Sequence, residues 1–404
     1  MVFAGALALG AVPAHAACQN FKGLPLVEIK EQGRDRLNAW AEALAPVVKG
    51  RDVVMLGEPS HGDGASIRVR SEIVEVLYKR FGFDVLIFEG DFYGLTFGWQ
   101  SVKDGNAIAS FARGNLYSFW SNTPAADPLW TFIQRTRSRG QSFDIAGMDV
   151  RLRGELSRAA IPGELSRVAA SEGIAISPPA LRGLADLLHS DLKPSAAVDE
   201  RAALRSVLEQ LLGRGLSNDA DRAIIQSLLY WAKFAWQDAS RDEGMAANLR
   251  WLVDHRFPGR KVIVWAHSNH ELRNASVWDR IADPAPRHMG NLFAEGREDQ
   301  VAVIGTIADG GVITSSFPKA LDWRDFDINE TVKIPSHAVD SVESYLAEKC
   351  NAPTILRLPR TGATPHLTAS AIDHFYEKQA DYAKAFDALV FVGPAKSLNL
   401  VRPK

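Results

Sequence analysis

Four ionisable side chains each follow a short apolar run that predicts a buried β-strand. They are Glu58, Glu89, Asp149 and His267. In open α/β sheets, ligands bind in the crevice outside the carboxyl ends of the strands. Because a buried carboxylate without a partner is costly, we expect these four groups to converge at one functional site.

The first cluster of chemically capable residues is the sequence Gly-Glu-Pro-Ser-His-Gly-Asp-Gly at residues 57–64. Glu58 and His61 lie three residues apart, so both side chains can reach one pocket. A carboxylate beside an imidazole raises its basicity and can fix its tautomer. The alternative is a strand-to-helix loop in which Ser60 caps the helix. No Lys-Ser or Lys-Thr follows the glycines, which excludes a phosphate loop.

The other two clusters are Glu89, within Phe-Glu-Gly-Asp, and the pair His267 and His270, within His-Ser-Asn-His. Glu89 taken alone is also typical of a solvated loop carboxylate. The two histidines follow a buried strand, where packing alone seldom requires them. Their spacing suits a metal site with Glu89 as third ligand, and structural histidines with satisfied hydrogen bonds are the remaining alternative.

Several familiar hydrolase signatures are absent from the sequence. It contains no Gly-x-Ser-x-Gly nucleophile elbow and no His-Glu-x-x-His zinc helix. A serine nucleophile is therefore disfavoured. The residues that remain favour histidine and carboxylate chemistry acting on water.

The elements that position these residues are predicted from continuous apolar runs followed by helical patterns. Runs of this kind suit strands buried on both faces, as in a parallel sheet covered by helices. We therefore predict an α/β fold with a mostly parallel central sheet. The predicted strands are residues 52–56, 84–88, 143–148, 261–266, 301–305 and 388–392.

Between about residues 155 and 255 the pattern changes. Leucine and alanine recur at helical spacing in residues 202–212 and again in residues 223–236, and no strand-like run occurs. Breaks at residues 178–179 and 213–218 punctuate this region. We predict a helical subdomain inserted between the third and fourth strands of a single catalytic domain that spans residues 17–404.

Composition limits the classes of function. The chain has 404 residues, of which 46% are hydrophobic and 23% charged, as expected for a globular protein with a large core. Its net charge of −2 provides no basic surplus for nucleic-acid phosphates. The body of the chain has no apolar run long enough to predict a membrane span.

The N-terminus predicts export. An apolar run at residues 2–12 precedes Ala14-His15-Ala16, whose small residues suit a signal peptidase. We predict a signal peptide over residues 1–16 and a periplasmic or secreted mature chain, although the usual basic residue at the start is missing. Cys18 and Cys350 are the only cysteines. In an oxidising compartment they can form one disulfide, and two free thiols are the alternative.

Taken in order, these motifs resemble those of the erythromycin esterase family. Residues 57–62 match Gly-Glu-Ala/Pro-Thr/Ser-His-Gly, and Glu89 matches a strand that ends in glutamate. Residues 265–270 match Trp-Ala-His-Asn-x-His, with Ser268 in place of asparagine. The resemblance spans residues 51–305. Two further matches lie within it, an Arg-Asp-x-x-Met-Ala-x-Asn helix at residues 241–248 and a Met-Gly pair at residues 289–290.

The resemblance implies an α/β core with a helical lobe and hydrolysis of an ester or macrolactone by water, without a metal or other cofactor. It makes His61 the leading candidate for general base, with Glu58 orienting it and Glu89 positioning the water. His267 and His270 would stabilise the oxyanion or protonate the leaving alkoxide, and each is a further candidate for the base. Arg70 falls where the family carries an active-site arginine, which could steady developing negative charge.

One segment departs from the family pattern. After His61 the family usually has bulkier residues, whereas residues 63–66 read Asp-Gly-Ala-Ser. This segment was expected to line the pocket, which leaves the acceptance of macrolides open. Two other classes of function also stay open. One is a metal-dependent hydrolase that uses the same glutamates and histidines, and the other is a non-catalytic periplasmic protein that binds haem, a metal or another ligand.

Overall fold

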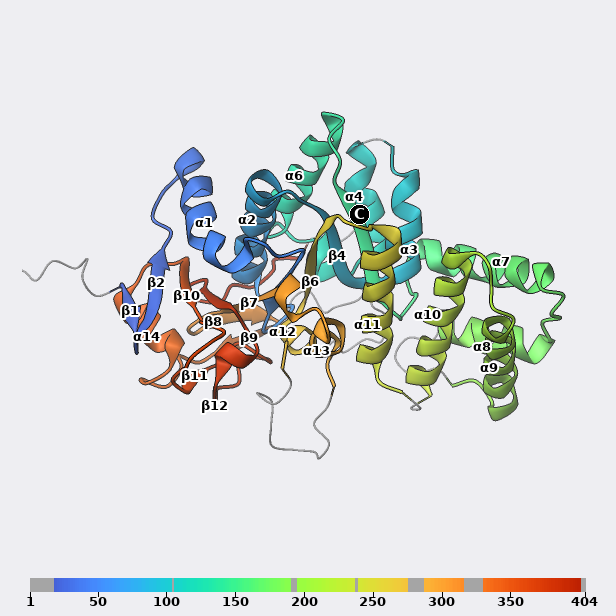
Figure 1. Ribbon diagram of the computed structural model, residues 1–404. Coiled ribbons are helices and arrows are strands. Elements are labelled where there is room, and N and C mark those ends of the chain that lie inside the picture. Colours follow the sequence, from blue (N-terminus) through green and yellow to red (C-terminus); the bar gives the residue numbers. More distant parts are fainter. Residues whose placement is uncertain are drawn as a thin grey trace, which may run out of the picture.

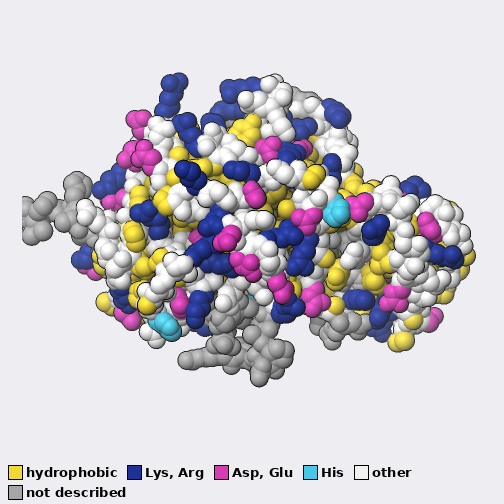
Figure 2. Space-filling view, in the orientation of Figure 1, with side chains coloured by type: hydrophobic (Ala, Val, Ile, Leu, Met, Phe, Trp, Pro, Cys, Tyr) yellow, Lys and Arg dark blue, Asp and Glu magenta, His cyan; other side chains and the backbone are white. Residues whose placement is uncertain are grey.

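The computed structural model describes residues 18–103, 105–189, 195–236, 239–274, 287–315 and 330–400 (Figure 1). The predicted signal peptide, residues 1–16, lies outside the described residues. The face seen in Figure 2 carries acidic and basic side chains interspersed with one another, in keeping with the near-zero net charge.

A large mixed sheet of nine strands forms the centre of the described structure, in the order β1-β2-β10-β13-β7-β3-β6-β4-β5. Six neighbouring strands run parallel, which confirms the predicted fold class. They are β13 (Ala388–Phe391), β7 (Val301–Ile307), β3 (Val53–Glu58), β6 (Lys261–His267), β4 (Phe83–Asp91) and β5 (Asp144–Asp149).

An antiparallel edge that the sequence analysis did not predict extends this sheet. β10 (Thr354–Arg357) pairs antiparallel with β13 and with β2 (Leu24–Glu28), which pairs in turn with β1 (Asn20–Phe21). β1 and β10 are short, and no strongly apolar run marks β2, so their sequences resemble loops. Two small hairpins lie outside this sheet and join β8 (Gly311–Thr314) to β9 (Thr331–Ile334) and β11 (Leu367–Ala369) to β12 (Lys378–Ala380).

The central strands are buried because helices cover both faces of the sheet. Val53 and Met55 of β3 belong to one hydrophobic cluster, whereas Val54 and Leu56 belong to the other. Successive residues of a strand point to opposite faces, so a strand covered on both sides must be apolar at every position. The second cluster contains residues of α1 (Gly33–Val48), α2 (Gly64–Phe81) and α6 (Asp127–Ser138).

The segment between β5 and β6 consists of helices, with no strand in its described residues. In Figure 1, α7 to α10 form a lobe beside the sheet, and α11 lies between this lobe and the strands. Leucines at helical spacing fill the interior of the lobe, as Leu204, Leu208 and Leu211 do in α9. The helices are α7 (Glu155–Ser171), α8 (Pro178–His189), α9 (Val198–Gly213), α10 (Asp219–Ala235) and α11 (Arg241–Trp251).

Shorter helices connect the strand ends. The chain leaves β4 through α3 (Phe92–Gly98), α4 (Ile108–Asn115) and α5 (Ser118–Ser121) before it enters α6. It leaves β6 through α12 (Ser268–Glu271), and α13 (Met289–Ala294) packs beside α11. α14 (Val342–Lys349) precedes β10. These connections place several short segments at the carboxyl ends of the parallel strands.

A disulfide joins the beginning of the described chain to its C-terminal third, as predicted. Cys18 and Cys350 are bonded, with their Cα atoms 5.1 Å apart and a sequence separation of 332. The bond holds the β1–β2 edge beside α14. Among the described residues, no helix is both long and apolar enough to cross a bilayer.

Replacing both cysteines, as Cys18→Ser with Cys350→Ser, should lower the free energy of unfolding by about 2–4 kcal/mol, because the cross-link restricts the unfolded chain. Urea unfolding of wild type with and without reductant measures this loss. Reductant should shift the wild-type midpoint and leave the double variant unchanged. Equal midpoints for the oxidised wild type and the double variant would contradict the prediction.

Candidate active site

The parallel pairing of β3 with β6 brings the first and third motifs together. Glu58 and His267 are register partners at the carboxyl ends of these two strands. Each is the last residue of its strand and not, as predicted, the residue after it, because the ladder continues one position further. A side chain at Gly57 would place its Cβ 2.5 Å from Oγ of Ser268, so glycine is required for α12 to pack against β3.

Glu58 is a buried carboxylate that contacts an imidazole through one oxygen and a guanidinium through the other. Its Oε1 lies 2.9 Å from Nδ1 of His61 and accepts a hydrogen bond of 2.9 Å from Nε1 of Trp120. Its Oε2 pairs with the Arg70 guanidinium. Because Nδ1 of His61 faces a carboxylate acceptor, the neutral ring carries its proton there. Nε2 is then left with a lone pair that can accept a proton.

Arg70 lies deeper than the sequence analysis placed it. Its side chain is fully buried, donates 2.9 Å to the carbonyl of Leu56, and stacks 3.8 Å above the ring of Trp265. The fully buried guanidinium offers no exposed surface to a substrate in this structure. Arg70 instead neutralises Glu58.

The ring of His61 lies among aromatic side chains. It stacks on Phe119, with 4.6 Å between the ring centroids. It meets the rings of Trp120 and His267 edge-on, with 5.1 Å between the centroids in each pair. Removal from water lowers the pKa of His61 to about 4, against the opposing charge of Glu89. His61 is therefore an unprotonated base at neutral pH.

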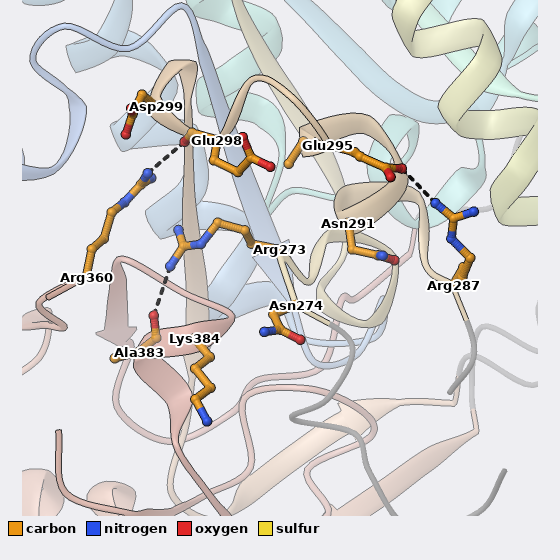
Figure 3. Close-up of a pocket in the computed structure, with 11 residues that line it drawn as sticks. Arg273, Asn274, Arg287, Asn291, Glu295, Glu298, Asp299, Arg360, Ala383 and Lys384 are labelled. Atoms are coloured by element: carbon orange, nitrogen blue, oxygen red, sulfur yellow. Dashed lines mark hydrogen bonds and ion pairs between the residues drawn. The ribbon is translucent and has the colours of Figure 1, made fainter. Parts of the chain in front are cut away.

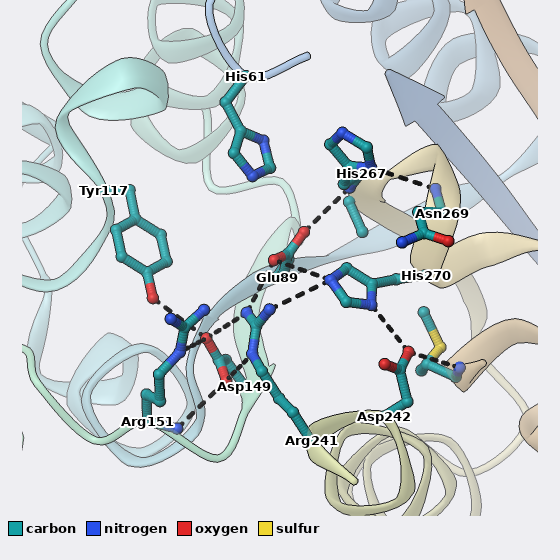
Figure 4. A network of polar contacts seen from close by, with 12 residues as sticks. His61, Glu89, Tyr117, Asp149, Arg151, Arg241, Asp242, His267, Asn269 and His270 are labelled. Atoms are coloured by element: carbon teal, nitrogen blue, oxygen red, sulfur yellow. Dashed lines mark hydrogen bonds and ion pairs between the residues drawn. The ribbon is translucent and has the colours of Figure 1, made fainter. Parts of the chain in front are cut away.

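A second ion-pair cluster surrounds Glu89 (Figure 4). Nη2 of Arg241, at the start of α11, lies 2.7 Å from Oε1 of Glu89 and 2.6 Å from Oδ2 of Asp149. The other Glu89 oxygen accepts 3.0 Å from the backbone N–H of His267. Burial alone would raise the pKa of Glu89, but the charges of His270 and Arg241 hold it well below its usual range. Glu89 is thus an ionised carboxylate, two residues before the end of β4.

His270 completes this cluster. Its Nδ1 lies 2.8 Å from Oδ1 of Asp242, which also accepts 2.8 Å from the backbone N–H of Met289. Its Nε2 lies 3.1 Å from Nη1 of Arg241 and 3.5 Å from Oε1 of Glu89. Burial would lower the pKa of His270, but the charges of Glu89 and Asp242 raise it above its ordinary value. His270 is therefore the histidine best able to carry and release a proton.

His267 differs from His61 in which ring nitrogen carries the proton. Its Nδ1 accepts 3.2 Å from the backbone N–H of Asn269, so the neutral ring carries its proton on Nε2. That Nε2 has no hydrogen-bond partner among the described residues, and 3.6 Å separates it from Oδ1 of Asp373. Burial holds the pKa of His267 well below its usual range. It is a neutral N–H donor at the centre of the group.

The structure thus brings together the five predicted residues Glu58, His61, Glu89, His267 and His270. Sequence reasoning missed their aromatic and C-terminal neighbours, because Trp120 lies in the short helix α5 and Asp373 and His374 lie in a loop, all far from any recognised motif. The one available signal was the adjacency of an aspartate and a histidine in a chain with 10 histidines.

The short segment after His61 does not line the site as expected. Asp63 is buried and caps α2 by accepting 3.0 Å from the N–H of Ala65 and 3.2 Å from that of Ser66. It also accepts 2.9 Å from the N–H of Lys396, which ties α2 to the C-terminal segment. A Cβ at Gly64 would lie 3.1 Å from the carbonyl oxygen of Ser397, so glycine at this position allows the C-terminal segment to pack closely.

The carboxylates of the alternative metal site are already paired with arginines. Arg70 pairs with Glu58, and Arg241 lies between Glu89, Asp149 and His270. A cation that bound Glu89 and His270 would have to displace the guanidinium of Arg241. Among the described residues, the one group whose ligand atoms converge without an arginine is His267, Asp373 and His374.

A cavity of 620 Å³ lies elsewhere, beside Arg273, Arg360 and Lys384 (Figure 3). Its three arginines are already engaged in the fold, and Arg287 donates 2.7 Å to Glu295. Arg273 donates 2.6 Å to Asp387, and Arg360 donates 2.7 Å to the carbonyl of Glu298. None of the predicted site residues lines this cavity, and we assign it no ligand.

A family model described as erythromycin esterase matches residues 79–393, which is most of the chain. Among curated proteins, the putative hydrolase YbfO of Bacillus subtilis (strain 168) is 22% identical over 327 residues. The match covers 72% of this chain and 70% of that protein.

Two solved structures share the fold. A Bacillus cereus protein has a TM-score of 0.65 and 15% identity, covering 93% of this chain and 95% of its own. A mutant of the erythromycin esterase EreC, solved in an open conformation, has a TM-score of 0.65 and 18% identity, covering 94% of this chain and 98% of its own. At these identities the likeness establishes the fold.

We predict that His61 and His270 titrate at clearly different pH values, because their surroundings shift the two pKa values in opposite directions. In histidine NMR spectra, His61 should titrate at about pH 4 and His270 above its ordinary value. The unfolded chain protonates His61 near pH 6.5, so its burial should cost stability as pH falls from there to about 4. The spectrum of His61→Ala assigns the first resonance. A titration midpoint near pH 6.5 for His61 would contradict the prediction that its pKa is lowered in the folded protein.

Proposed function

The chain belongs to the erythromycin esterase family, and from that premise we propose that it hydrolyses a carboxylic ester or macrolactone with a histidine-activated water. The family and its hydrolase relative support a hydrolase. The observation that carries the finer proposal is the contact of 2.9 Å between Glu58 and Nδ1 of His61. It leaves Nε2 of a neutral imidazole as the base.

In the proposed reaction, Nε2 of His61 takes a proton from water as the water oxygen attacks the acyl carbon. The carbonyl oxygen becomes an oxyanion, to which Nε2–H of His267 donates. When the ester C–O bond breaks, the leaving alkoxide takes a proton from His270. The proton on His61 then passes to solvent, and His270 is reprotonated. The products are a carboxylic acid and an alcohol.

Glu58, Glu89 and the arginines support these steps by position and charge. The ion pair of Glu58 with Arg70 fixes the tautomer of His61 without leaving net charge beneath it. Glu89 holds the backbone of His267 through its accepted hydrogen bond of 3.0 Å. Its negative charge also favours the protonated form of His270. Preorganised groups of this kind need no rearrangement during the reaction.

The arginine pairs favour the metal-free scheme over the metal-dependent alternative. A metal ion bound by Glu89 and His270 would compete with Arg241, which already balances the charge of Glu89 and Asp149. The disulfide supports the proposed periplasmic or secreted location, because such bonds persist in oxidising compartments. A macrolide is the substrate class suggested by the family, and simple esters are the alternative.

His61→Ala and Glu89→Gln should each lower ester turnover by about a hundredfold or more, as loss of a positioned acid–base group usually does. Steady-state hydrolysis of 4-nitrophenyl butyrate measures the effect, with thermal unfolding of each variant to check the fold. His255→Ala is the matched control, because that histidine is largely exposed and precedes the start of β6, whose other end carries the site. Near-full turnover in His61→Ala would move the base to His267 or His270.

Activity should survive exhaustive chelation. The test is mass spectrometry of a macrolide panel incubated with chelator-treated protein, which should show addition of one water to at least one compound. Loss of hydrolysis on chelation, with recovery on adding zinc or manganese, would make these residues metal ligands. Absence of hydrolysis of every macrolide and of simple chromogenic esters would favour the non-catalytic binding protein.

A further inference from the structure

Three side chains that the proposed mechanism does not use as a unit converge beside His61. They are His267, Asp373 and His374, whose ligand atoms all lie within 4.8 Å of one another. Oδ1 of Asp373 is 3.6 Å from Nε2 of His267 and 3.4 Å from Nε2 of His374. Two of these residues come from the loop between β11 and β12, and the third from the end of β6.

The spacing suits a tetrahedral transition-metal site. Zinc binds histidine nitrogen and carboxylate oxygen at about 2.0–2.2 Å, so neighbouring ligand atoms of a tetrahedron lie roughly 3.3–3.5 Å apart. The two contacts of Asp373 match this separation closely. A small movement of either imidazole would bring the ligand nitrogens of the two histidines to the same separation. Three protein ligands would leave the fourth position for water.

The charges at this point differ from those in the rest of the site. Glu58, Glu89 and Asp149 are each paired with an arginine, whereas Asp373 has only the two histidines as ion-pair partners among the described residues. The buried Nε2 of His267 has no hydrogen-bond partner there and is directed towards Asp373. A divalent cation would satisfy both groups at once.

The loop that carries two of the ligands is held in place by its backbone. The N–H of His374 donates 2.6 Å to the carbonyl of Pro59, which joins this loop to the segment before His61. His374 and Phe375 have φ angles of 45° and 60°. Side chains rarely adopt this left-handed region, and such backbone is found where surrounding structure imposes it. The side chains of Asp373 and His374 remain partly exposed, at 24% and 29%, so an ion can enter from solvent.

We propose that His267, Asp373 and His374 bind Zn²⁺, and that the bound ion inhibits the hydrolase. A nitrogen-and-oxygen site of this kind selects borderline metals such as zinc over Mg²⁺, which requires oxygen ligands. Ligation at Nε2 moves the His267 proton to Nδ1 and breaks the hydrogen bond from Asn269. His267 then has no N–H to donate to an oxyanion. The inhibitory half of the proposal rests on the proposed function, and the binding half does not.

Isothermal titration of chelator-treated, full-length protein with Zn²⁺ tests the binding half. We expect saturable binding of one ion per chain, weakened about tenfold or more in Asp373→Asn and in His374→Ala. His366→Ala is the matched control and should bind as wild type does. Mg²⁺ should not compete. Absence of saturable binding, or equal affinity in wild type and both loop variants, would overturn the site.

Ester hydrolysis at increasing free Zn²⁺ tests the inhibitory half. Wild-type turnover should fall with a midpoint that follows the zinc affinity from titration. In Asp373→Asn, the zinc concentration that halves the variant's own zinc-free turnover should be about tenfold higher or more. Zinc that binds and leaves turnover unchanged, or raises it, would overturn inhibition. If chelated wild type hydrolyses no ester, the proposed function fails, and the titration still decides the metal site.

Discussion

The structure depends on neutralising three carboxylates buried near the carboxyl ends of the parallel strands β3, β4 and β5. Glu58 has Arg70, and Glu89 and Asp149 share Arg241. Removing one partner of a buried ion pair typically costs about 3–5 kcal/mol, because the other charge stays buried. These arginines are therefore as necessary to the fold as to the chemistry. They also decide which carboxylates stay available to a metal.

The helical segment between β5 and β6 contributes directly to the site. Its last helix, α11, begins with Arg241 and Asp242, which contact Glu89, Asp149 and His270. The lobe packs through its leucines, and its helix α10 contacts α11.

Much of the site could be predicted because strand ends and short motifs are local in sequence. The apolar runs before Glu58 and His267 indicated both the strands and the edge at which they end. The depth of Arg70 could not be predicted, because a motif gives a residue type and not the layer it occupies. Asp373 and His374 could not be found either, since a loop from the C-terminal third reaches the site only through tertiary packing. The antiparallel edge was missed for a similar reason, as β10 and β1 are too short to leave a pattern.

The central claim is that His61 activates water directly, with Glu58 and Arg70 behind it and no metal in the reaction. The most direct measurement is a single turnover of 4-nitrophenyl butyrate by chelator-treated protein in excess, in ¹⁸O-labelled water, with mass analysis of product and protein. The account predicts one solvent oxygen in the carboxylate of the butyrate formed in that first turnover, and none in the protein. Unlabelled butyrate together with label in Glu58 or Glu89 would show that a carboxylate attacks the ester, and would contradict it.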